Sequence, residues 1–168
     1  DFKDYFTVLL YTGMRKGELL TLTWERVNFD TNIITIPKVY SKTKKQKLIL
    51  MTDEVREILL RRKQAGHPAP FSCYTENMPL NRLERAIKVA GIREYDEDGE
   101  NLVLHSSRHT TASRLVLEGV PLETVAELLG HASVQTTEKY YIQYKVDQQL
   151  PAIAALDKIA SKRKATQD

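Results

Sequence analysis

The chain carries side chains that could break a phosphodiester bond through a covalent intermediate. A tyrosine hydroxyl can attack phosphorus, and arginines keep their charge and present paired donors to the non-bridging oxygens. Histidines can orient the nucleophile or transfer protons. The residues that fit these roles are Arg15, His105, Arg108, His131 and Tyr140. Their combination predicts phosphoryl transfer that needs no metal ion.

The nucleophile of such a reaction would come from the segment that follows His131. Tyr140 lies nine positions after His131, and Tyr141 and Tyr144 follow closely. Adjacent residues of a helix differ by about 100° in direction, so only one of Tyr140 and Tyr141 can face a given site. Spacing alone does not separate these two, and aromatic packing also explains a cluster of tyrosines.

Arg15 has a possible partner on its own helix. It follows Thr12-Gly13-Met14 at an expected helix start, where backbone amides favour an anion. Glu18 lies three positions later on the same face. Glu18 therefore either holds the arginine in place or forms a solvated pair with it.

His105 and Arg108 have the spacing i, i+3 near a second expected helix start. Residues three apart lie on one helical face, so the two side chains could converge on one site. His109 would then point elsewhere, in a structural or capping role.

Basic residues are concentrated although the net charge is only +3. A ten-residue stretch without acidic residues holds Lys38, Lys42, Lys44, Lys45 and Lys47. A local basic surface matters more to nucleic-acid binding than the overall charge does. These lysines predict either a DNA-binding hairpin or a hairpin that is merely solvated.

Several function classes are disfavoured by the composition. The sequence has no His-Glu-x-x-His motif and no glycine-rich phosphate loop, which argues against a two-metal nuclease and against an NTPase. Cys73 is the only cysteine, so neither an internal disulfide nor a cysteine-based zinc site is expected, and the cytoplasm is the expected compartment. No apolar run approaches the roughly 20 residues of a membrane span.

The spacing of apolar residues predicts an α+β fold that is mainly helical. Helices are expected from the start of the chain to Gly13, from Thr52 onward, and over residues 15–22, 79–89, 107–118, 122–129, 134–144 and 146–160. The β-branched run around Ile34 and the run Leu48-Ile49-Leu50 predict two strands joined by the lysine-rich stretch. We therefore expect one helical domain with a small antiparallel β-sheet.

Together these motifs resemble the catalytic domain of the tyrosine recombinases, the phage integrase family. Residues 12–24 (TGMRKGELLTLTW) are similar to the first family box and contain Arg15. Residues 104–110 (LHSSRHT) resemble the second box, with His105 and Arg108. Leu129-Gly130-His131 supplies the last histidine, Tyr140 follows at the family spacing, and Ser41-Lys42-Thr43 is similar to the site of the family's lysine.

The resemblance implies a reaction in which Tyr140, rather than Tyr141, attacks the scissile phosphate and forms a 3′-phosphotyrosine link. Arg15, Arg108 and His131 would stabilise the transition state. Both arginines would hold the phosphate.

The same resemblance implies the remaining participants. His105 would assist proton transfer or hold the phosphate, and Lys42 would protonate the leaving 5′ oxygen. Double-stranded DNA is the implied partner, and four protomers normally act together on two duplexes. No cofactor, ATP or metal ion is implied.

The chain departs from the family pattern in places. Ser106 and Ser107 stand where the family usually has Asp-Leu, and Ile142 stands where a histidine often follows the tyrosine. The sequence also starts almost at the first box. We therefore expect residues 1–160 to be the catalytic domain, residues 161–168 to be a disordered basic tail, and the core-binding and arm-binding domains to be absent.

Three alternatives fit parts of the pattern. Residues 124–134 read as a helix-turn-helix, which would suit a DNA-binding module without catalysis. A type IB topoisomerase shares the arginine, lysine, histidine and tyrosine chemistry, but it relaxes supercoils without pairing two sites. A catalytically weak domain of the same fold would follow if Ser106 and Ser107 disturb the second box.

Overall fold

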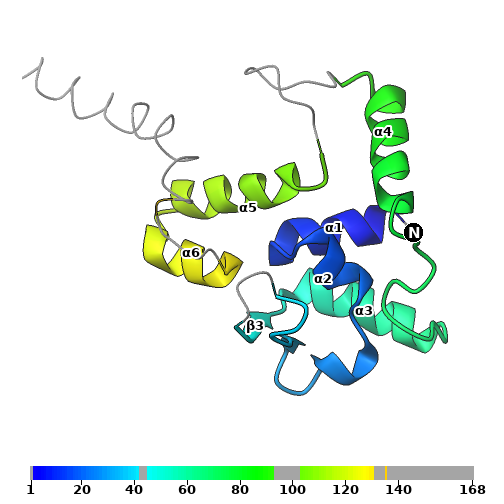
Figure 1. Cartoon of the computed structure of the whole chain (residues 1–168), viewed down its shortest axis with the longest axis horizontal. Helices are drawn as coiled ribbons and strands as arrows, with labels where there is room; N and C mark the ends of the chain where they lie inside the picture. Colours follow the sequence, from blue (N-terminus) through cyan, green and yellow to red (C-terminus); the bar gives the residue numbers. More distant parts are fainter. Residues whose placement is uncertain (1, 42–44, 93–102, 131–134, 136–168) are drawn as a thin grey trace, which may run out of the picture.

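The structure is a computed structural model that describes residues 2–41, 45–92, 103–130 and 135 (Figure 1). The α-helices of this part are α1 (Phe2–Thr12), α2 (Lys16–Leu20), α3 (Asp53–Gln64), α4 (Met78–Ala90), α5 (Ser106–Leu117) and α6 (Leu122–Leu129). A 3-10 turn, η1 (Trp24–Arg26), precedes the strands β1 (Val27–Asn28), β2 (Ile33–Ile36) and β3 (Lys47–Leu50). This arrangement confirms the expected fold class.

The sheet is antiparallel, in the order β1-β2-β3. Strand β2 pairs with β3 in a register that joins Ile33 to Leu50 and Ile36 to Lys47. Along β3 the side chains alternate, because successive residues of a strand point to opposite faces. Lys47 and Ile49 are buried, whereas Leu48 and Leu50 are exposed. The two longer strands were predicted from the sequence, but β1 was not, since two residues show no periodicity.

Helix α1 connects two apolar cores. One core joins α1 and α2 to the sheet and α3, with Tyr5, Leu9, Leu19, Ile34 and Leu59 among its buried members. The smaller core joins α5 to α6 through Ala112, Val116, Val125 and Leu129. Figure 1 shows α1 lying between α5 and α3, so that segments far apart in sequence meet along its length.

Most predicted helices occur close to their expected bounds. The Thr52 hydroxyl accepts a hydrogen bond from Val55 N at 3.3 Å, which starts α3 as expected for an N-cap threonine. The helix expected over residues 15–22 is the shorter α2, since Arg15 is its N-cap and Thr21 its C-cap. The helices expected over residues 134–144 and 146–160 lie outside the described residues. No described helix is long and apolar enough to cross a membrane.

The end of α1 meets the end of α6 at Gly13. This glycine has a φ of +58°, a conformation that L residues adopt only with strain. A Cβ placed on Gly13 would lie 2.2 Å from Cδ2 of Leu129, so no side chain fits between the two helices. Gly13 thus permits both the turn after α1 and its close approach to α6.

Gly13→Ala is expected to destabilise the fold by about 3 kcal/mol, from the left-handed backbone conformation and from overpacking against Leu129. Urea unfolding measures this loss as a drop in the free energy of unfolding.

Gly66→Ala is the matched control. Gly66 also has a positive φ, of +77°, but nothing lies within 4 Å of the place where its Cβ would be. Gly66→Ala should therefore lower the free energy of unfolding only through the backbone conformation, by about 1 kcal/mol. Equal losses for the two variants would show that the contact with Leu129 contributes nothing.

Candidate functional site

Arg108 of α5 is a buried cation held by carbonyl oxygens. Arg108 is only 1% exposed. Nη1 donates to the Gly13 carbonyl and Nη2 donates to the Leu129 carbonyl. Its Nε is buried and has no hydrogen-bond partner within the described residues. Because burial of a charge with incomplete pairing is unfavourable, the guanidinium is a group that would gain from an added anion.

Burial and neighbouring charge act together on Arg108. Burial lowers the pKa of its guanidinium to about 10, and the nearby positive charge of Arg15 lowers it further, while Glu18 raises it. The two arginines that the sequence assigned to one site are therefore close enough to interact electrostatically. Arg108 remains charged at neutral pH.

Glu18 holds Arg15 at the start of α2. Its Oε2 accepts a hydrogen bond from Arg15 N at 2.9 Å, and its Oε1 lies 3.2 Å from Arg15 Nη1. Glu18 is only 2% exposed, whereas the Arg15 side chain is 23% exposed. Of the two alternatives that the spacing left open, the structure has the buried support rather than the solvated pair. The arginine remains partly accessible to a ligand.

Lys47 of β3 joins the same group. It is 8% exposed, and its Nζ donates to the Leu129 carbonyl at 3.4 Å, the same oxygen that accepts from Arg108. Burial lowers the pKa of its ammonium to about 8, opposed by Glu18 and assisted by Arg108 and Arg15. Lys38 and Lys45, by contrast, are exposed.

Sequence reasoning grouped Lys47 with the other lysines of the hairpin and did not anticipate its burial. The alternation of side chains along a strand could have indicated it, because Lys47 lies two residues before buried Ile49 and next to exposed Leu48. What the sequence lacked was a reason to place a lysine on the inner face.

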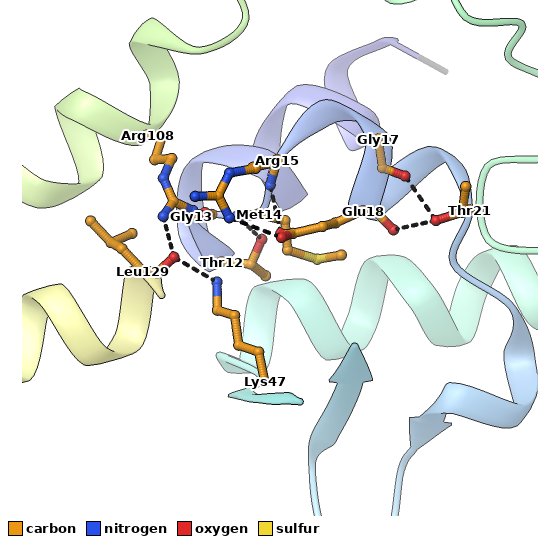
Figure 2. A network of polar contacts seen from close by, with 10 residues as sticks. All are labelled: Thr12, Gly13, Met14, Arg15, Gly17, Glu18, Thr21, Lys47, Arg108 and Leu129. Carbon is orange, nitrogen blue, oxygen red and sulfur yellow. Dashed lines mark hydrogen bonds and ion pairs between the residues drawn. The ribbon is translucent and has the colours of Figure 1, made fainter. Parts of the chain in front are cut away.

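The network has an excess of positive charge. In Figure 2 the side chains of Arg15, Arg108 and Lys47 converge from α2, α5 and β3, and Glu18 is the carboxylate among them. Three cations face one carboxylate in this described part of the site. Such an arrangement favours binding of an anion with several oxygens, as a phosphate has.

The second box begins with a turn that its serines stabilise. The Ser106 hydroxyl accepts from Val103 N at 3.2 Å, and the Ser107 hydroxyl donates to the Leu104 carbonyl at 2.8 Å. These bonds fix the entry into α5 directly after His105. Although the serines differ from the family pattern, they make local contacts suited to that position.

His105 and His109 lie against each other at the start of α5. Their ring centroids are 4.9 Å apart in an edge-to-face arrangement, so His109 does not point elsewhere as the sequence suggested. Burial lowers the pKa of His109 to about 4, and the charges of His105 and Arg108 act in the same direction. His109 is therefore neutral at physiological pH and packs beside the exposed His105.

Four predicted site residues lie outside the described part of the chain: Lys42, Lys44, His131 and Tyr140. The structure does describe the residues that lead to one of them. Helix α6 ends at Gly130, which has a φ of +65° and immediately precedes His131. The structure thus brings Arg15, Glu18 and Arg108 together and adds Lys47 to them.

Sequence and structure comparisons agree on the relatives of this chain. A XerD tyrosine recombinase of Staphylococcus aureus is 34% identical over 143 residues, which cover 79% of this chain and 47% of that protein. The crystal structure of a XerA recombinase has a TM-score of 0.67 at 27% identity, covering 83% of this chain and 53% of that one.

A XerH site-specific recombinase has a TM-score of 0.72 at 24% identity, covering 94% of this chain and 45% of that one, which shows the fold. The chain spans less than half the length of the curated relatives, between 43% and 47%. Residues 2–147 match the phage integrase family. Because this match covers most of the sequence, the chain belongs to the phage integrase family.

Proposed function

We propose that the chain is the catalytic domain of a tyrosine-type site-specific recombinase, which cleaves and rejoins double-stranded DNA through a 3′-phosphotyrosine link. The observation that carries this proposal is the cluster of Arg15, Arg108 and Lys47 around a single carboxylate, with a buried Arg108 Nε left for a further acceptor. A scissile phosphate supplies the missing negative charge. A non-catalytic DNA-binding module would leave Arg15, Lys42 and His105 without a task.

In this proposal the described residues act on the phosphate. The guanidinium groups of Arg15 and Arg108 bind the non-bridging oxygens and stabilise the additional negative charge of the transition state. Glu18 keeps the first guanidinium in place through its two bonds to Arg15. Since Arg108 is fixed by two backbone carbonyls, little reorganisation is needed when the charge develops.

The remaining roles fall partly to residues outside the described part and partly to the described His105, Lys38 and Lys45. Tyr140 attacks phosphorus, and the bond to the 5′ oxygen breaks as the bond to the tyrosine oxygen forms. Lys42 protonates that leaving oxygen, while His105 and His131 assist the proton transfers and hold the phosphate. The exposed Lys38 and Lys45, together with Lys44, bind the DNA backbone beside the site.

The partners follow from the relatives. The XerH recombinase was solved bound to palindromic difH substrate, and a lambda integrase dimer of similar fold was solved bound to a core site. By analogy this chain acts on duplex DNA in the cytoplasm, as part of a tetramer on two duplexes. Residues 1–160 would form the catalytic domain and residues 161–168 a basic tail.

Tyr140→Phe is expected to abolish the covalent protein–DNA adduct, because the nucleophilic oxygen is removed while the ring is kept. The assay incubates the chain with a nicked duplex that traps the cleaved state, and the attachment site is mapped by mass spectrometry. Tyr141→Phe is the matched control and should still form the adduct. An adduct that survives in Tyr140→Phe and disappears in Tyr141→Phe would move the nucleophile by one residue.

Arg15→Gln is expected to slow adduct formation by about 100-fold or more, since one preorganised donor to the transition state is lost. The backbone amide of residue 15 can still donate to Glu18, so the start of α2 should persist, which circular dichroism checks. Arg61→Gln is the control because Arg61 also pairs with a carboxylate, that of Asp4, at 2.7 Å, but its side chain is 64% exposed. Equal rates in the two variants would argue against a phosphate site at Arg15.

A further inference from the structure

Lys47 occupies a place where an apolar side chain would be expected. It is the first residue of β3 and shares the buried face of the sheet with Ile49. Its stem packs over the end of α6, since a Cβ placed on Gly130 would lie 3.5 Å from Lys47 Cδ. Its Nζ reaches the Leu129 carbonyl at 3.4 Å. Lys47 therefore joins the hairpin to the last turn of α6 by both packing and a hydrogen bond.

The charge of this lysine is unfavourable for folding. Arg15 and Glu18 face it from the start of α2, Arg108 faces it from α5, and the Leu129 carbonyl faces it from the C-terminus of α6. Burial lowers its pKa to about 8 from the ordinary 10.5, and the positive charges of the two arginines act in the same direction. A methionine of similar length would fill the space without this desolvation, and apolar replacements of buried charges are often neutral or stabilising.

The hydrogen bond has a consequence for the site as a whole. The Leu129 carbonyl accepts from both Lys47 and Arg108, so the two cations fix one oxygen from two directions (Figure 2). Any shift of this carbonyl moves the hydrogen-bond partner of Arg108.

We propose that Lys47 is a positioning residue for DNA strand cleavage, which fixes the Leu129 carbonyl against Arg108 and so sets the placement of Arg108. This role rests on the proposed recombinase function. It is distinct from the proton donor assigned to Lys42, and it needs no contact between Lys47 and the DNA.

The role depends on a protonated ammonium, which gives it a pH signature. Below about pH 8 Lys47 carries its charge and donates strongly, and as pH rises through about 8 the free protein loses that proton. A bound phosphate favours the charged form, so in the DNA complex the loss occurs at or above this pH. An arginine at the same position stays charged throughout this range.

The test compares Lys47→Met and Lys47→Arg with the wild-type chain. Adduct formation on the nicked duplex is followed in single turnovers from about pH 7 to about pH 9.5, and DNA affinity is measured by fluorescence anisotropy. We expect Lys47→Met to be slower by about 10- to 100-fold at neutral pH, with affinity nearly unchanged, because displaced catalytic groups affect the reaction more than binding. Lys47→Arg should recover much of the rate and lack the fall that the wild type shows at alkaline pH.

Lys88→Met is the control, because Lys88 is an exposed lysine of α4. It should match the wild type in rate and in affinity.

Stability provides a readout that separates positioning from folding. Between pH 8 and 10.5 the unfolded chain binds a proton at Lys47 that the folded chain does not, so the free energy of unfolding of the wild type should rise with pH in this window. Lys47→Met lacks this contribution and should be at least as stable as the wild type at neutral pH. A slower variant that is not less stable supports the proposal.

Other results overturn it. If Lys47→Met reacts as fast as Lys88→Met, or if it is slow only because it unfolds, Lys47 has no positioning role. If Lys47→Arg is as slow as Lys47→Met, the retained charge is not what matters and the proposal fails. If the wild-type chain itself forms no adduct, the recombinase function fails first and the positioning role falls with it.

Discussion

The backbone carbonyl of Leu129 is the point on which the described site depends. It accepts hydrogen bonds from Arg108 of α5 and from Lys47 of β3, while the Leu129 side chain occupies the space that a Cβ on Gly13 would need. The carbonyl of Gly13 in turn accepts from Arg108. Three segments that are distant in sequence therefore meet through one residue at the end of α6. Since the last carbonyls of a helix have no partners within it, this one is available to cations.

The arrangement concentrates positive charge that the described residues do not neutralise. Arg108 and Lys47 both have lowered pKa values, first because they are buried and also because the nearby cations repel them. The unfavourable charge is compensated only in part by Glu18, whose carboxylate is already engaged with Arg15. A phosphate would relieve this repulsion, and it would do so most in the transition state, when its negative charge is greatest. The repulsion among these cations and the proposed affinity for a reacting phosphate thus have the same physical origin.

The sequence predicted the parts of this site that depend on local spacing. Arg15 and Glu18 lie three apart on one short helix, and the helix ends at Gly13 and Gly130 follow from the positive φ that glycine tolerates. The convergence of Arg15 with Arg108 came from the family resemblance rather than from spacing, because 93 positions separate them in the chain. The burial of Lys47 was not predicted, since it depends on the packing of α6 against the hairpin. Strand β1 was also missed, because its two residues form a strand only through their pairing with β2.

The network extends to Gly130, which caps α6 at the end of this described segment. Gly130 itself packs against the Lys47 stem and follows the carbonyl that Lys47 and Arg108 share. A disturbance of the Leu129 carbonyl therefore reaches Arg108 directly, because Arg108 Nη2 donates to the same oxygen. This is why a change at Lys47 should act first on Arg108, the other side chain that donates to this carbonyl.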